Sequence, residues 1–217
     1  MTRTRFLASA LSFVAALIVG GPHAFAASPV NVPTSAPAST QSIVFAGGCF
    51  WGVQAVFQHV KGVKSATSGY AGGEKSTAEY EIVSSGRTGH AESVEVVFDP
   101  AVVTLGTLLN VFFTVTHDPT ELNRQGPDVG TQYRSAIFYS TPAQQQAVTA
   151  FIDKLKETKL YKHPIVTDVT PLKGFYKAEA YHQNYAKTHP DEPYIFFNDR
   201  PKVVNLKSQF PELYVEG

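Results

Sequence analysis

Cys49 is the single cysteine of the 217-residue chain, and its surroundings favour a reactive thiol. The apolar run 42–46 (SIVFA) predicts a buried strand, Gly47-Gly48 a turn, and a helix directly after Cys49. Free N–H groups and the dipole at a helix start stabilise a thiolate and lower the pKa of a cysteine. A lone cysteine can also be an inert buried residue. The two glycines and an exposed aromatic pair, Phe50-Trp51, favour a nucleophile.

Residues 89–100 (GHAESVEVVFDP) offer a proton donor. With a period of two, Glu92 shares a strand face with Val94, Val96 and Phe98, the more apolar face. Burial there would raise the pKa of the carboxyl and make Glu92 an acid near neutral pH. A reversed face or a later strand start would leave Glu92 solvated, and the pattern alone does not decide between these readings.

Other candidate residues carry weaker signals. Tyr80 and Tyr133 would ordinarily be half-buried rings, although two phenols converging on an oxyanion would be hydrogen-bond donors. The seven histidines include no HExxH pair and His90-x-Glu92 is too short a signal, so we predict no metal site. Residues 69–73 (GYAGG) lack the Lys-Ser/Thr of a phosphate-binding loop.

The elements that must position these residues mix strands and helices without strict alternation. Strands are predicted at 42–46, 64–70, 93–98, 133–139 and 165–170, and helices at 50–60, 105–112, 142–155 and 177–188. The loop 118–131 is too long for an ordinary connector, and the proline-rich tail from Asp191 is expected to lack regular structure. This pattern predicts an α+β fold, a ferredoxin-like two-layer sandwich with a mixed sheet and Cys49 at a strand-to-helix corner.

Composition excludes several classes of protein. The 18 Lys and Arg balance the 18 Asp and Glu, so no electrostatic signature of nucleic-acid binding is present. One cysteine cannot form an intramolecular disulfide. The 43% hydrophobic content excludes a disordered chain and suits a domain with a core.

The N-terminal residues predict export. Two arginines before Phe6, an apolar stretch at 6–21 and Ala24-Phe25-Ala26 predict a secretory signal peptide at 1–26, cleaved near Ala26/Ala27. The apolar stretch is too short to span a membrane comfortably, so we expect no stable insertion after cleavage. Residues 27–41, rich in Pro, Ser and Thr, predict a tether, and 42–217 form one domain. The protein is therefore expected in the periplasm or outside the cell.

Five motifs stand in a characteristic order along this domain: GGCFWG at 47–52, GYAGG at 69–73, TGHAE at 88–92, HDP at 117–119 and GTQYRS at 130–135. Together they resemble the peptide methionine sulfoxide reductase A family. The resemblance extends from about Ser42 to Tyr214, nearly the whole predicted domain.

The resemblance implies a reaction. Cys49 would attack the sulfur of methionine S-sulfoxide, free or in protein, while Glu92 protonates the sulfoxide oxygen and Tyr80 and Tyr133 hydrogen-bond it. Sulfoxide oxygen leaves poorly until it is protonated, so an acid of raised pKa suits the chemistry. Loss of methionine would leave Cys49 as a sulfenic acid.

The resemblance also implies a substrate-binding set. Phe50 and Trp51 match the aromatic pair that holds the substrate methyl group. Asp128 matches a polar residue near the site, and His182 and Tyr185 match positions with a supporting role.

The sequence departs from the commoner family pattern because it has no second cysteine to attack the sulfenic acid. Ser84 stands where some relatives have a cysteine. We therefore expect no bound cofactor and regeneration by an external thiol, either a small molecule or a thioredoxin-like protein. The expected partners are this thiol and oxidised proteins or free methionine sulfoxide, with no nucleic acid, and we expect a monomer.

Three other classes are compatible with a reactive cysteine. A one-cysteine thiol peroxidase would need a thioredoxin-like unit with an activating Arg and Thr, which the sequence does not show. A thiol acyltransferase or peptidase would need a histidine base. A binding module would use Phe50-Trp51 as a platform and tolerate Cys49→Ser. The five motifs favour the reductase.

Overall fold

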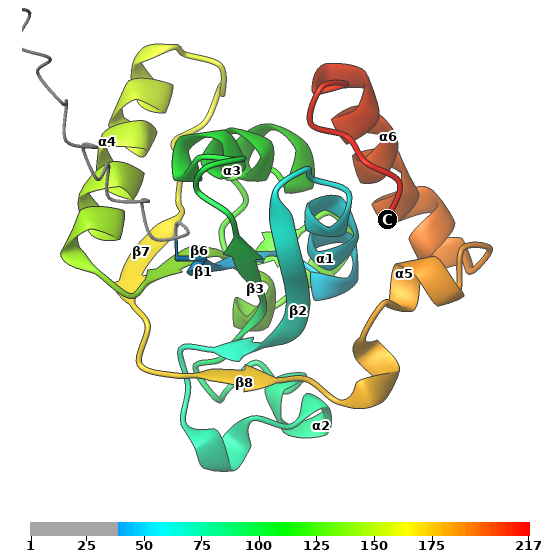
Figure 1. Ribbon diagram of the computed structural model, residues 1–217. Helices are drawn as coiled ribbons and strands as arrows, with labels where there is room; N and C mark the ends of the chain where they lie inside the picture. The colour runs from blue at the N-terminus through cyan, green and yellow to red at the C-terminus, as the bar shows by residue number, and fades with distance from the viewer. Residues whose placement is uncertain (1–38) are drawn as a thin grey trace, which may run out of the picture. The chain divides into compact units, whose positions relative to one another are not determined.

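The computed structural model describes residues 39–217, so the predicted signal peptide and most of the predicted tether lie outside the described residues. A six-stranded sheet with the order β7-β6-β1-β3-β2-β8 forms one layer (Figure 1). Its strands are β1 (Gln41–Gly47), β2 (Val63–Ala71), β3 (Ala91–Phe98), β6 (Ser135–Tyr139), β7 (Asp168–Pro171) and β8 (Phe175–Lys177).

The predicted ferredoxin-like arrangement is confirmed. The central strands β6-β1-β3-β2 pair antiparallel, and α1 (Phe50–Gln58) and α3 (Leu105–Val111) lie in the β1–β2 and β3–β6 connections. The sheet is mixed because β7 pairs with β6 in parallel. The helix predicted behind Thr141 is α4 (Pro142–Glu157), whose first turn donates from Gln144 N–H to Thr141 Oγ1 at 3.2 Å.

The two faces of the sheet differ in the size of their side chains. On the helix side Phe45 of β1 stacks on Phe57 of α1, and on Phe112 beyond α3, with ring centroids 4.9 and 4.7 Å apart. The opposite face carries small residues such as Ala46 and Ala91, and Leu172 and Phe175 pack against it. Small side chains let the chain pass close to the sheet where it runs from β7 at one edge to β8 at the other (Figure 1).

The prediction for the C-terminal tail is wrong. A π-helical turn, Ile195–Asp199, leads into α6 (Arg200–Gln209), which packs beside α1. Pro201 lies in the first turn of α6, where a missing N–H costs nothing, so this proline starts a helix instead of preventing one.

The predicted helix at 177–188 is also wrong. Lys177 is the last residue of β8, and a 3₁₀ turn (Ala180–His182) and the short α5 (Tyr185–Thr188) follow it. Left-handed Asn184, with φ of 59°, separates the two turns. Three smaller differences from the predicted elements remain. The strand predicted at 165–170 is β7, which begins only at Asp168, and the strand predicted at 133–139 is β6, which a 3₁₀ turn (Thr131–Tyr133) precedes. The long loop predicted at 118–131 contains a hairpin of β4 (Arg124–Gln125) and β5 (Asp128–Val129).

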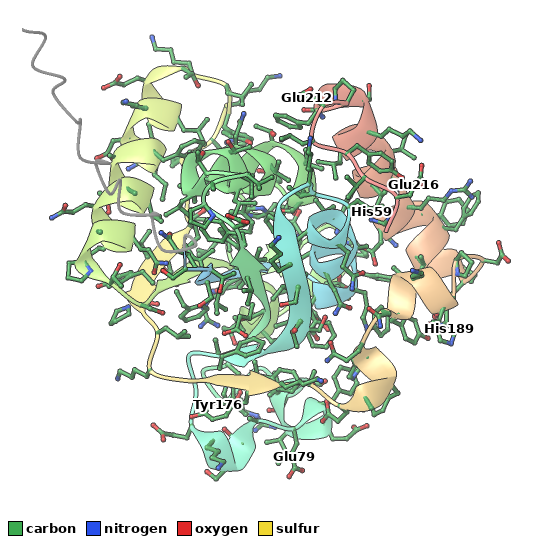
Figure 2. The ribbon with its side chains drawn as sticks, in the orientation of Figure 1. His59, Glu79, Tyr176, His189, Glu212 and Glu216 are labelled. Atoms are coloured by element: carbon green, nitrogen blue, oxygen red, sulfur yellow. The ribbon has the colours of Figure 1, made fainter. Side chains whose placement is uncertain are left out.

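Side chains tie the remaining segments to this frame. The ring of Tyr176 in β8, labelled in Figure 2, meets the ring of His90 edge-on at 5.7 Å. The helix α2 (Tyr80–Val83) follows Glu79, and its first N–H, that of Tyr80, donates to Glu179 Oε1 at 2.8 Å. Among residues 39–217, no helix is both long and apolar enough to cross a membrane.

Residues 178–184 do not form a helix, and hydrogen bonds from the side chains of two glutamines hold them in place. Gln183 continues the edge of the sheet beyond β8, because its side chain accepts from Ser68 N–H and donates to Ser68 C=O at 3.1 and 2.9 Å. Gln54 of α1 is 2% exposed, donates to Ala66 C=O and to Gln183 Oε1 at 3.0 Å each, and accepts from Asn184 N–H at 2.8 Å. This buried amide network joins α1, β2 and the segment that carries His182.

We predict that Gln54→Ala lowers the free energy of unfolding by about 1–3 kcal/mol, because the buried partners of Gln54 lose their hydrogen bonds. The matched control is Gln58→Ala, which removes an exposed 2.7 Å bond from the same helix to Asn184 and should change stability by less than about 0.5 kcal/mol. Urea denaturation measures both values. Equal losses in the two variants would contradict the prediction.

Candidate active site

Cys49 lies at the predicted strand-to-helix corner, as the N-cap of α1. It is 7% exposed. Gly48 before it has φ of +91°, and a Cβ at Gly48 would come within 2.6 Å of Gln125 Cγ in the long loop. Glycine is therefore required here both for its backbone conformation and for the approach of that loop.

Glu92 of β3 points from the apolar face of the strand to the start of α1, so the first of the two orientations weighed is the one found. It is 3% exposed, and its Oε2 accepts a hydrogen bond from Phe50 N–H at 3.1 Å. Burial raises the pKa of this carboxyl to about 8, and the negative charges of Asp128 and Asp199 act in the same direction. Hydrogen bonds from Phe50 N–H and from Cys49 partly oppose the shift. Glu92 is thus protonated at neutral pH.

The expected lowering of the Cys49 pKa is wrong for the resting protein. Burial raises the pKa of this thiol well above its usual value, and the neighbouring Glu92 and Asp199 add to the increase. A hydrogen bond from the Trp51 backbone and the charge of Lys202 oppose it only in part. The helix terminus is present as expected, but desolvation and two carboxyls outweigh it. The site therefore holds a neutral thiol beside a neutral carboxyl.

Tyr80 and Tyr133 converge on this pair. Both are half-buried, and the pKa of each phenol is raised, first by burial and then by the charge of Glu92, with Cys49 contributing to both. Tyr133 enters from the 3₁₀ turn before β6 and Tyr80 from the first turn of α2. Both hydroxyls remain protonated and can donate hydrogen bonds near Cys49 and Glu92.

The aromatic pair after Cys49 divides between core and site. Phe50 is only 1% exposed, so its expected exposure is wrong: its ring packs 5.9 Å from the ring of Tyr70 and 5.0 Å from that of His182. Trp51 is half-buried and stacks on Tyr185, with ring centroids 3.9 Å apart and planes 12° apart. Trp51 and Tyr185 form an apolar wall.

His182 holds the ring of Trp51 in place from the protein interior. It is 2% exposed, and its Nδ1 accepts a hydrogen bond from Trp51 Nε1 at 3.1 Å. Its Nε2 lies 4.0 Å from Glu179 Oε2. Burial lowers the pKa of the imidazole, so His182 acts as a neutral acceptor. The supporting position that the resemblance implied is thus a contact with Trp51.

Asp128 meets Tyr194, a residue that sequence analysis missed. The Tyr194 hydroxyl donates a hydrogen bond to Asp128 Oδ2, and its ring meets Trp51 edge-on with centroids 5.9 Å apart. Burial raises the pKa of Asp128, which Tyr194 and Lys202 oppose. Through this bond Asp128 joins the long loop to the C-terminal segment, and the ring of Tyr194 lies between Asp128 and Trp51 at the edge of the apolar wall.

The start of α6 and the residue before it supply two more residues that the sequence analysis missed. Asp199 is fully buried, and its Oδ1 lies 3.0 Å from Lys202 Nζ. Burial raises the pKa of Asp199, and Lys202 opposes the shift. The local sequence signal for this helix is Pro201 in its first turn, because Asp199 makes no capping hydrogen bond there.

His90 of the TGHAE motif and His117 of the HDP motif form hydrogen bonds to neighbouring segments of the chain. His90 Nδ1 accepts from Gly73 N–H at 3.2 Å, so its Nε2 donates to Glu74 C=O at 3.0 Å. His117 bonds Ser135 Oγ at 2.7 Å, and burial lowers its pKa to about 4. Within the part of the chain that the structure describes, no cluster of His, Cys, Asp and Glu could hold a metal ion.

Comparison with known proteins points to one family. The family model described as peptide methionine sulfoxide reductase matches residues 41–213. A protein of Mesorhizobium japonicum named peptide methionine sulfoxide reductase MsrA 2 is 58% identical over 182 residues, covering 84% of this chain and 93% of the relative. A protein of the same name from Synechocystis sp. is 48% identical over 183 residues, covering 84% and 86%.

Solved structures of similar proteins point to the same family. The reduced form of Mxr1 from Saccharomyces cerevisiae superposes with a TM-score of 0.66 at 35% identity, covering 72% of this chain and 90% of that chain. Methionine sulfoxide reductase A of Corynebacterium diphtheriae gives a TM-score of 0.62 at 38% identity, covering 72% and 77%.

The raised pKa of Glu92 predicts a pH-dependent stability. Between the usual carboxyl value of 4.5 and about 8 the folded protein binds a proton at Glu92 that the unfolded chain releases, so the free energy of unfolding falls as pH rises through this window. Glu92→Gln keeps an acceptor for Phe50 N–H but does not titrate, so it should lose less stability between pH 5 and pH 8. Chemical denaturation at both values measures the difference.

Glu95→Gln is the matched control for this experiment. Glu95 lies three residues along the same strand, and its variant should keep the wild-type dependence on pH. Parallel losses in wild type and Glu92→Gln would show that Glu92 does not carry the effect.

Proposed function

The chain belongs to the peptide methionine sulfoxide reductase family, and we propose that Cys49 is the nucleophile and Glu92 the proton donor of its reaction. The enzyme reduces methionine S-sulfoxide to methionine. The observation that carries the assignment is the bond from Phe50 N–H to Glu92 Oε2, which holds a protonated carboxyl beside the helix start that Cys49 occupies.

The neutral pair suits a reaction that begins and ends with an uncharged site. Glu92 gives its proton to the sulfoxide oxygen, and the carboxylate so formed takes the proton of the Cys49 thiol. The thiol sulfur supplies the electron pair and receives the oxygen as Cys49–SOH, while methionine leaves with its sulfur reduced. A proton that moves between neighbouring groups leaves no unpaired charge in the buried site. Tyr80 and Tyr133 donate to the sulfoxide oxygen as charge develops on it.

The aromatic wall provides the substrate pocket. The substrate methyl group packs against Trp51, an apolar surface that favours a thioether tail over a charged one, and Phe50 supports this surface from the core through His182. Asp128, His182 and Tyr185 act by fixing Trp51: His182 accepts from its indole, Tyr185 stacks on it, and Asp128 anchors Tyr194 at its edge. Free and protein-bound methionine sulfoxide present the same group to this wall.

Regeneration needs a thiol from outside the sequence, since Cys49 is its single cysteine. An external thiol, from a small molecule or a thioredoxin-like protein, attacks the sulfur of Cys49–SOH as its thiolate, and the expelled hydroxide takes up the proton of that thiol and leaves as water, giving a mixed disulfide. A second external thiol then frees Cys49. No bound cofactor takes part in this cycle.

We also propose that the enzyme works after export on oxidised proteins of the periplasm or the cell exterior. The proposal rests on the charged, apolar and small-residue pattern of residues 1–26. The single methionine of the chain, Met1, would leave with that segment, so the exported enzyme would have no methionine of its own to oxidise.

We predict that one turnover of residues 27–217 with methionine S-sulfoxide and no reductant releases about one equivalent of methionine and adds one oxygen to the Cys49 peptide. Intact mass, peptide mass and free methionine are the readouts. Cys49→Ser should give neither product, and methionine release by that variant would remove Cys49 as the nucleophile.

The same experiment tests Glu92. Glu92→Gln should slow methionine release by about 10²–10⁴-fold, the usual contribution of a general acid. In the wild type the rate should fall as pH rises through about 8, where Glu92 loses its proton, and this fall should be absent in the variant. An unchanged rate in Glu92→Gln would assign the proton to another group.

Export predicts a defined N-terminus. The full chain expressed in a bacterium with a periplasm should be recovered from that compartment with Ala27 or a close neighbour first, as read by N-terminal sequencing. Ala24→Asp/Ala26→Asp should block cleavage, because the peptidase needs small residues there. A cytoplasmic protein that keeps Met1 would overturn the proposal.

A further inference from the structure

The ion pair of Asp199 and Lys202 has no part in the chemistry described so far. Asp199 is fully buried, its Oδ2 has no hydrogen-bond partner among residues 39–217, and the Lys202 side chain is 18% exposed. Buried ion pairs are rarely favourable for stability alone, since desolvation offsets the attraction. The position of Asp199 and Lys202 in the fold points to another role for this pair.

The pair lies against the first turn of α1. A Cβ at Gly52 would collide with Asp199 Oδ1 and come within 2.8 Å of Lys202 Nζ. Gly52 is three residues beyond Cys49, so an ammonium group and a carboxylate rest on the turn that presents the thiol. The glycine at position 52 is the reason that they approach so closely.

The other groups around Cys49 are acidic or neutral. Glu92 faces it from β3 and Asp199 from the segment before α6, and Asp128 lies near Glu92. The phenols of Tyr80, Tyr133 and Tyr194 complete the surroundings. Among residues 39–217, Lys202 is the cation whose charge acts on Cys49, and it also acts on Asp128. A thiolate formed here would meet carboxylates on two sides and one ammonium group.

We propose that Lys202 is a positioning residue whose charge, anchored on α1 by Asp199, offsets the negative charge that Cys49 acquires when it becomes a nucleophile. The inference rests on the proposed role of Cys49. Asp199 has two opposite effects: it holds Lys202 in place, and its own charge opposes ionisation of the thiol. The charge of Asp199 acts on the Cys49 thiol more strongly than that of Lys202, so removing Asp199 should increase the thiolate fraction even though it releases Lys202, whereas removing Lys202 should decrease it.

Alkylation by iodoacetamide tests this without any reductase assay, because Cys49 is the one thiol that can react. The rate follows the thiolate fraction, so a pKa change of one unit gives a change of about tenfold at a pH below the pKa. At pH 8, Lys202→Gln should react about tenfold more slowly than wild type and Lys202→Arg within about twofold, while Asp199→Asn should react faster. The pH profile of each variant should shift accordingly.

Two further variants keep the test decisive. Lys207→Gln removes an exposed pair with Glu216 from the same helix and should leave the rate unchanged. If Lys202→Gln does not fold, Asp199→Asn/Lys202→Gln leaves no buried charge unpaired, and it should react more slowly than Asp199→Asn alone. An unchanged rate in Lys202→Gln, or changes of the same sign in Lys202→Gln and Asp199→Asn, would overturn the proposal.

The test separates this inference from the proposed function. Methionine release by Cys49→Ser would refute Cys49 as the nucleophile, while alkylation would still report the effect of Lys202 on its thiol. Opposite shifts in alkylation, together with slower single-turnover reduction in Lys202→Gln, support both.

Discussion

The hydrogen bond from Phe50 N–H to Glu92 Oε2 is the interaction on which the site depends. It joins the middle of the sheet to the first residue of α1, and so fixes an acid beside the residue that caps this helix. The acid remains protonated because the strand face that carries it is covered by the helices. Two glycines, Gly48 and Gly52, then admit the long loop and the C-terminal segment to the same helix end. The ferredoxin-like core thereby brings three distant parts of the chain to one thiol.

The electrostatics of the site favour a neutral resting state with a charged transition. Burial keeps both the thiol and the carboxyl protonated, which avoids two adjacent buried anions. The groups that respond to developing charge, the phenols of Tyr80 and Tyr133 and the ammonium of Lys202, come from three different elements. Tyr80 packs on the ring of His182 and Lys202 pairs with Asp199 before substrate arrives, so these two groups need little reorganisation during the reaction.

Much of this frame could be predicted from local pattern, and the failures have a common cause. The run before Gly47 placed Cys49 at its corner, and Thr141 with Pro142 marked the start of α4, because each signal lies within a few residues. Alternation left two orientations open for Glu92, and its contact with Phe50 decides between them. The helix predicted at 177–188 failed because Gln183 pairs with Ser68, 115 residues away. The burial of Phe50 against Tyr70 and His182, the raised pKa of Cys49 and the helix in the tail likewise depend on residues that are distant in the sequence. Local sequence carries no record of such contacts.

Trp51 is the only tryptophan in the sequence, and it lies in the wall of the site with its indole bonded to His182 and its ring stacked on Tyr185. When the protein is excited at the long-wavelength edge of its absorption, where the ten tyrosines do not absorb, its emission therefore originates from a single ring two residues from the reacting cysteine. The intensity and wavelength of this emission follow the polarity, stacking and hydrogen bonding around Trp51. The fold thus carries a built-in optical reporter, which can follow substrate entry and each oxidation state of Cys49 in unlabelled protein.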